Sequence, residues 1–162
     1  MIQRVKVGMA DLNTVISPGI LITLGLGSCV GIALYDGQVK IAGLAHIMLP
    51  YSNLIKNNEN KAKFADTAIL QLVEDMIALG AKKERLRAKL AGGAQMFTFN
   101  DRDSNLLKIG ERNVIASLET LSKLNIPVVA QDTGGNYGRT VELYADTGDF
   151  LIKTIGHGTK YI

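Results

Sequence analysis

The hydrophobic positions of this chain recur at two different spacings, and the first is typical of strands. In the first 50 residues, short apolar and β-branched runs are separated by turn sequences such as Pro18-Gly19 and Asp36-Gly37. The two-residue turn at Asp36-Gly37 predicts that the strands on either side of it pair antiparallel. The strands predicted in this part are 4–9, 20–24, 30–35 and 40–49.

The second spacing is helical and dominates two later segments. Apolar residues recur every three or four positions in 60–79, which Gly80 closes, and again in 110–124, which Pro127 follows. Further strands are predicted at 86–99 (interrupted at Gly92-Gly93), at 128–131 and at 140–155, the last as a hairpin through 146–149. This order predicts one domain, 1–162, with an α/β or α+β layered sandwich built on a mixed sheet.

The composition narrows the classes of function. Of 162 residues, 47% are hydrophobic and 20% are charged. The sequence contains no run of about 18 apolar residues, so we expect no direct insertion into a membrane. The single cysteine cannot form an internal disulfide, and the polar N-terminus lacks a secretory signal, so we expect a cytoplasmic protein. The net charge of +3 is scattered, which argues against nucleic acid and favours an acidic protein partner.

The segment 25–31, Gly-Leu-Gly-Ser-Cys-Val-Gly, is the most informative in the chain. Its glycines resemble a dinucleotide loop, but the spacing differs from that motif and a strand follows where a helix is needed. Small neighbours would instead leave the sulfur of Cys29 accessible, and the backbone N–H groups of Gly27, Ser28 or Cys29 would be free to bind an oxyanion. The alternative is that Cys29 is a small buried hydrophobic residue.

His46 is the candidate base for this thiol. It lies in an apolar strand, where its ring needs a polar partner, and the plain alternative is a core histidine bonded to a backbone carbonyl. The predicted antiparallel pairing brings His46 to the same end of the strands as Cys29. A thiol needs such a base, because its free pKa of about 8.5 leaves little thiolate at neutral pH. His157 is the other candidate base, but its Gly-His-Gly context fits a loop better.

Thr23 is the candidate third member, because a hydroxyl can hold an imidazole in the required tautomer. Six residues of straight strand span about 20 Å, so Thr23 reaches the site only if the chain bends at Gly25 or Gly27. Without that bend, Thr23 is an ordinary strand residue.

Other motifs carry less weight. Two Asp-Thr-Gly triplets, at 132–134 and 146–148, resemble the signature of aspartic proteases, but no repeat surrounds them and turn chemistry explains them better. No cluster of His, Cys, Asp and Glu has the spacing of a metal site. The glycine-rich segment 132–140 fits a loop lining the site or a long turn equally well.

At these residues the chain resembles the CheD family, the chemoreceptor glutamine deamidases of bacterial and archaeal chemotaxis. The catalytic Thr, Cys and His of that family correspond to Thr23, Cys29 and His46. Gln95 stands where the family usually has a negative residue. The matching segments are 6–10, 25–31, 45–50, 89–97, 109–113 and 132–136.

The resemblance implies a three-layer αβα sandwich similar to the catalytic domain of cytotoxic necrotizing factor. It implies that the thiolate of Cys29 attacks a glutamine amide in the cytoplasmic domain of a methyl-accepting chemoreceptor, and that water then releases glutamate from the thioester without a cofactor. It also implies a partner, the phosphatase CheC. Two other interpretations remain open: an adaptor that binds receptors and CheC without turnover, and a cysteine peptidase.

Phe97 and Phe99 are candidate partner-binding residues. They alternate along a predicted strand that runs into polar residues, so both rings enter the core or both stand at the surface. At the surface they would form an apolar anchor for a receptor helix.

Overall fold

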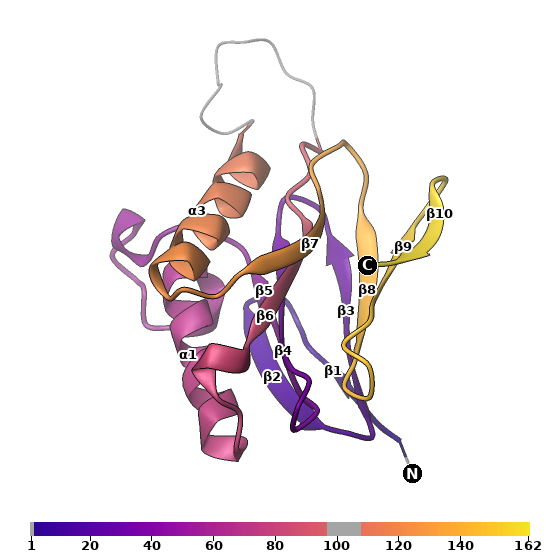
Figure 1. Ribbon diagram of the computed structural model, residues 1–162. Coiled ribbons are helices and arrows are strands. Elements are labelled where there is room, and N and C mark those ends of the chain that lie inside the picture. The colour runs from indigo at the N-terminus through magenta and orange to yellow at the C-terminus, as the bar shows by residue number, and fades with distance from the viewer. Residues whose placement is uncertain (1, 97–107) are drawn as a thin grey trace.

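The computed structural model describes residues 2–96 and 108–162, which form two five-stranded mixed sheets and two α-helices (Figure 1). The outer sheet consists, in spatial order, of β1 (Gln3–Lys6), β3 (Gly19–Leu26), β8 (Arg139–Tyr144), β9 (Phe150–Thr154) and β10 (Gly158–Tyr161). The central sheet consists of β2 (Asp11–Ile16), β5 (Ile41–Ile47), β4 (Val30–Asp36), β6 (Arg87–Gly92) and β7 (Val128–Thr133). The helices are α1 (Ala65–Leu79) and α3 (Ile109–Lys123), and short 3₁₀ turns lie at Ser52–Leu54, Lys61–Lys63 and Lys83–Arg85.

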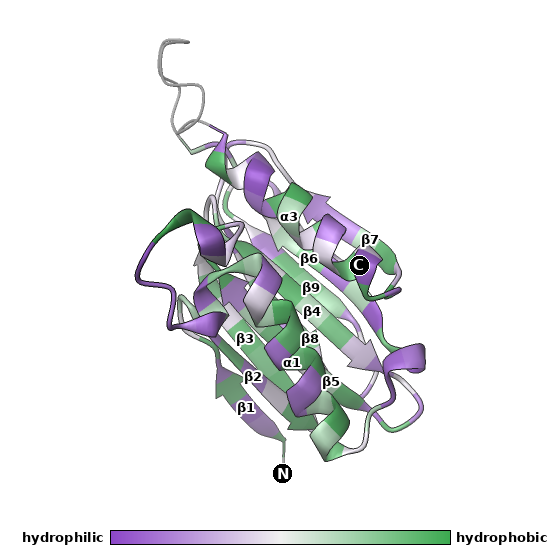
Figure 2. Ribbon diagram, turned by 90° about the vertical axis from the view of Figure 1, so that its left-hand side faces the viewer, coloured by the Kyte–Doolittle hydropathy of each residue, from purple (hydrophilic) through white to green (hydrophobic). Residues whose placement is uncertain are grey.

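Both helices lie on the same face of the central sheet, as Figure 2 shows from the helix side. One apolar core fills the space between helices and central sheet, and a second fills the space between the two sheets. The mixed α+β sandwich predicted from the sequence is therefore confirmed. The expected αβα order of layers is wrong for the described residues, since the outer sheet takes the place of one helical layer.

The outward face of the outer sheet carries charged side chains among its apolar ones. On that face Glu142 pairs with Lys153 at 2.6 Å and with Arg4 at 3.5 Å. The central sheet is different, since every residue of β5 is buried. A strand that is buried on both faces must lie between two layers. The similarity to the catalytic domain of cytotoxic necrotizing factor stays a prediction.

Most predicted elements are found within a few residues of their expected bounds. The hairpin of β8 and β9 and the antiparallel pair of β4 and β5 are confirmed. The first helix begins five residues later than predicted, because Asn60 caps a 3₁₀ turn before it by accepting a hydrogen bond from Ala62 N–H. Edge strands β2 and β10 were not predicted, since both carry many exposed polar residues.

None of the described helices is long and apolar enough to cross a membrane.

Candidate active site

Cys29 lies where the chain passes from the outer sheet to the central sheet. Strand β3 ends at Leu26 and β4 begins at Val30, so residues 27–29 form the connection, here called the nucleophile loop. The chain bends just before this loop: the pairing of β3 with β8 shifts register between Thr23 and Leu26, and Gly25 has a φ of +69°. The predicted bend at Gly25 is thus confirmed.

The end of β6 supports the nucleophile loop from one side. Gly93 N–H donates to Cys29 O at 2.8 Å, and Ala94 N–H donates to Gly27 O at 2.8 Å. Gly92 has a φ of +106°, and a Cβ at this position would lie 2.3 Å from Cys29 O. Only glycine fits there. The Gly-Gly pair was interpreted as an interruption of a strand, but its structural role is to let β6 approach the loop closely.

His46 shares an interior space with Cys29. In the pairing of β4 with β5, His46 lies opposite Gly31, two residues after Cys29, so the thiol and imidazole are diagonal neighbours. Cys29 belongs to the core between the sheets and is 8% exposed, whereas His46 is 1% exposed. The expectation that both residues lie at the same end of the paired strands is confirmed, and the register places them on the same face of the sheet. No hydrogen bond joins the thiol to His46 within residues 2–96 and 108–162. That the sulfur lies within or slightly beyond hydrogen-bond reach of the ring stays a prediction.

Thr23 reaches His46 across the gap between the sheets. Its hydroxyl donates to Val7 O at 2.7 Å and lies 2.7 Å from His46 Nδ1. A hydroxyl has one proton, so if Val7 O receives it, Thr23 Oγ1 must accept from Nδ1–H. This relay places the imidazole proton on Nδ1 and leaves a lone pair on Nε2. The predicted contact of Thr23 with His46 is confirmed.

Nε2 of His46 is the end of this relay that remains without a partner in the described part of the chain, and it is buried. Burial lowers the pKa of His46, which keeps the ring neutral near neutral pH. Burial also raises the pKa of the Cys29 thiol, and the residue's own backbone N–H opposes this shift in part. The resting pair is therefore a thiol beside a neutral imidazole, not a preformed ion pair.

The candidate oxyanion donors differ in availability. Gly27 N–H donates to Gly25 O at 3.1 Å and is therefore engaged within the bend. The N–H groups of Ser28 and Cys29 donate to no other residue's backbone oxygen among the described residues, and the Cys29 N–H faces its own sulfur. An oxyanion beside the thiol thus has two backbone donors near it.

Asn113 is a buried polar residue that the sequence reasoning did not single out. It is 0% exposed on α3, and its Nδ2 donates to Ser28 O and to Met48 O, each at 3.0 Å. One amide thus joins the nucleophile loop to the chain just after His46. The signal in the sequence was a polar residue at a helix position facing the core.

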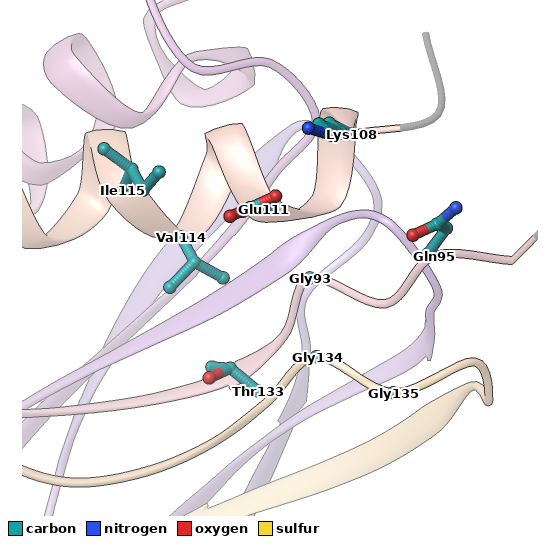
Figure 3. A pocket seen from close by; sticks show the side chains of 9 residues that line it. All are labelled: Gly93, Gln95, Lys108, Glu111, Val114, Ile115, Thr133, Gly134 and Gly135. Atoms are coloured by element: carbon teal, nitrogen blue, oxygen red, sulfur yellow. The ribbon is translucent and has the colours of Figure 1, made fainter. Parts of the chain in front are cut away.

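The glycine-rich segment 132–140 lies against the Gly-Gly turn after β6. Gly134 N–H donates to Gly92 O at 3.0 Å, and the buried Arg139 guanidinium donates to Gly134 O at 2.9 Å and pairs with Asp132 at 3.3 Å. Thr133, Gly134 and Gly135 line a cavity of about 280 Å³ together with Gly93 and the first turns of α3 (Figure 3). The segment therefore consists of the end of β7, a loop at 134–138 and the start of β8, and its first part lines a cavity next to the residues that support the nucleophile loop.

The remaining candidates are not part of this arrangement. His157 is exposed and stacks on Tyr137, with ring centroids 4.1 Å apart. Phe97 and Phe99 lie outside the described residues. Within the described ranges, no group of three or more His, Cys, Asp or Glu side chains could hold a metal ion.

Comparison with known proteins identifies the family. The family model described as "CheD chemotactic sensory transduction" matches residues 48–154. A protein of Caldanaerobacter subterraneus subsp. tengcongensis named "Probable chemoreceptor glutamine deamidase CheD" is 63% identical over 157 residues, covering 97% of this chain and 96% of its own. Proteins of the same name from Moorella thermoacetica and Lachnoclostridium phytofermentans are 58% and 54% identical, each covering 99% of this chain and 96% and 99% of their own lengths. With this agreement over nearly the whole length, the chain belongs to the CheD family.

Proposed function

We propose that this protein converts glutamine side chains of methyl-accepting chemoreceptors to glutamate, with Cys29 as nucleophile and His46 as base. The observation that carries the proposal is the relay from Val7 O through Thr23 to His46 Nδ1, which leaves Nε2 unprotonated and without a partner in the described part of the chain, on the strand that pairs with the one following Cys29. The names of the relatives support the same substrate class.

The first half of the reaction forms a thioester. His46 Nε2 takes the proton of the Cys29 thiol, and the sulfur attacks the carbonyl carbon of the glutamine amide. The N–H groups of Ser28 and Cys29 stabilise the oxyanion. The C–N bond then breaks, and ammonia leaves with the proton that His46 received.

The second half regenerates the enzyme with water. Neutral His46 takes a proton from water, the hydroxide attacks the thioester carbon, and the C–S bond breaks. The thiolate recovers its proton from His46, and the receptor side chain is now glutamate. The net reaction consumes one water and releases one ammonia, and it requires no cofactor.

The proposal includes two statements about the cell. The enzyme acts in the cytoplasm, where the signalling domains of chemoreceptors lie, and a CheC-type phosphatase is its protein partner. The net charge of +3 supports association with acidic protein surfaces. Copurification of a tagged CheC with this protein tests the second statement, and failure to copurify at low salt contradicts it.

The reaction is tested with a purified chemoreceptor cytoplasmic fragment. Mass spectrometry of its peptides should show conversion of specific glutamines to glutamates, and ammonia should appear in equal amount. Cys29→Ser is the matched control and should leave the fragment unchanged. A fragment that binds but stays unmodified would support the adaptor, and a shortened fragment would support the peptidase.

A further inference from the structure

Asn113 makes a contact that determines how a backbone donor points. Its side chain is fully buried, and both of its amide hydrogens are directed at carbonyl oxygens, those of Ser28 and Met48. A carbonyl oxygen only accepts hydrogen bonds, so the NH₂ group must face them and the amide cannot be turned around. Asn113 Oδ1 is buried and has no partner in the described part of the chain, so the orientation is set by the two carbonyls alone.

The geometry of the peptide bond links this contact to the direction of the Cys29 N–H. The carbonyl of Ser28 and the N–H of Cys29 belong to one planar trans peptide unit, so they point in opposite directions. By holding Ser28 O toward α3, Asn113 directs Cys29 N–H away from the helix. That N–H donates to no other residue's backbone oxygen among the described residues and faces only its own sulfur, so an oxyanion formed at the sulfur would lie on the side to which the N–H points.

The second hydrogen bond of Asn113 concerns the base. Met48 lies two residues after His46, at the end of β5 where that strand pairs with the start of β4. The same amide therefore fixes the nucleophile loop relative to the strand that carries the imidazole. Gly92 and Gly93 support the loop from β6, so Asn113 is the contact from the helical layer.

We propose that Asn113 is a positioning residue for deamidation: it aims Cys29 N–H at the oxyanion and holds the thiol in place relative to His46. The inference rests on the proposed function. A residue with this role acts chiefly on the transition state, because an oxyanion exists there and not in the bound glutamine. Its loss should lower kcat much more than it changes KM.

Two substitutions and one control test this proposal. Asn113→Ala removes both hydrogen bonds without adding charge, and Asn113→Asp keeps the shape but replaces the NH₂ donor by an oxygen that repels both carbonyls. Ser117→Ala is the matched control, because Ser117 is also buried on α3, one turn later, and donates only to the backbone oxygen of Asn113 at 2.7 Å. Each variant is assayed well below its own Tm, beside wild type at the same temperature.

We expect kcat on a chemoreceptor fragment to fall about 10- to 100-fold in both Asn113 variants, with KM within about 3-fold of wild type. Alkylation of Cys29 by iodoacetamide forms no oxyanion, so its rate at high pH should stay within about 3-fold of wild type. Ser117→Ala should keep kcat near the wild-type value.

Three results would overturn the proposal. The first is an Asn113→Ala variant whose kcat equals that of Ser117→Ala. The second is a parallel fall of kcat and alkylation, which assigns Asn113 a general role in holding the loop. The third is loss of the fold in both Asn113 variants. If instead wild type fails to deamidate the fragment while its thiol still reacts with iodoacetamide, the proposed function is wrong and the proposed role of Asn113 falls with it.

Discussion

The buried polar groups at the two ends of strand β4 differ in whether they have hydrogen-bond partners. At the end of the strand, the Asp36 carboxylate is fully buried and accepts hydrogen bonds from Arg85 Nε at 2.9 Å, Lys82 N–H at 2.9 Å and Gln38 N–H at 3.1 Å. Cys29 lies just before the first residue of β4, and Nε2 of its diagonal neighbour His46 has no hydrogen-bond partner among the described residues.

This difference separates a site whose polar groups are all paired from the proposed active site. Burial opposes ionisation of Asp36, but the hydrogen bonds of Arg85, Lys82 and Gln38 outweigh it and lower the pKa of the carboxyl group. Every strong acceptor position of Asp36 is thus used within the fold. The His46 end leaves one acceptor free, which costs stability but keeps a proton acceptor for chemistry.

The other unpartnered buried atoms lie near the same end. Among the described residues, the buried side-chain atoms without a partner belong to His46, Asn113 and Arg139. Asn113 bonds to Ser28 O, and Arg139 bonds to Gly92 O, whose residue lies against Cys29. The buried polar atoms that lack hydrogen-bond partners therefore cluster around the nucleophile loop, as is expected near a catalytic site.

The largest expected effect comes from the proposed active site. Cys29→Ser should lower kcat by roughly 10⁴-fold, because a serine hydroxyl beside a lone imidazole is a much weaker nucleophile than the thiol. Receptor binding and Tm should be nearly unchanged, since the replacement is almost isosteric. Glutamine conversion by mass spectrometry checks the rate, and retained conversion would refute the thiol mechanism.

A substitution at Asp36, at the other end of β4, should lower stability and leave activity unchanged. Asp36→Ala leaves Arg85 and two backbone N–H groups without their acceptor and should lower the free energy of unfolding by about 3 kcal/mol. Activity per folded molecule should not change. Urea unfolding measures the loss, with the exposed Glu84→Ala in the neighbouring turn as control, and similar stability of both variants would contradict the comparison.

Removing the relay should have a smaller effect. Thr23→Val keeps the shape but cannot accept from His46 Nδ1–H, so we expect kcat to fall about 10²-fold through loss of imidazole orientation. Thr23→Ser retains the hydroxyl and should recover most of the rate. Equal rates in the two variants would reduce Thr23 to a packing residue.

The smallest effects concern pH. Because burial lowers the pKa of His46, the imidazole stays neutral below its ordinary value of about 6.5, and kcat/KM should keep its plateau there and decline only at lower pH. Because the pKa of Cys29 is raised, the rate of alkylation by iodoacetamide should still be increasing with pH at about pH 8.5, where an ordinary thiol is half ionised. Alkylation that is already complete near pH 6 would instead indicate a preformed ion pair.

The same pKa shift of His46 has a consequence for stability. Below about pH 6.5 the unfolded chain binds a proton that the folded chain does not, so the free energy of unfolding should decrease as the pH falls. Thermal unfolding between pH 7 and pH 5 measures this decrease. A rise in Tm over that range would contradict the burial of a neutral His46.

The sequence by itself determined the local elements and which residues are candidates for the site. Helical spacing located both helices, and the turn at Asp36-Gly37 gave the antiparallel pair that brings Cys29 and His46 to one end. These features depend on neighbours in the chain, and a period of 3.6 or 2 residues is visible without knowledge of the fold.

Only the tertiary structure decided which strand joins which sheet and which atoms meet. The strands divide between two sheets, so Thr23 approaches His46 across the gap between them and not along one strand. Asn113 and Ser28 are 85 positions apart in the chain, yet one hydrogen bond joins them. Such contacts depend on how separate faces pack, and hydrophobic spacing records that a face is buried but not what is buried against it.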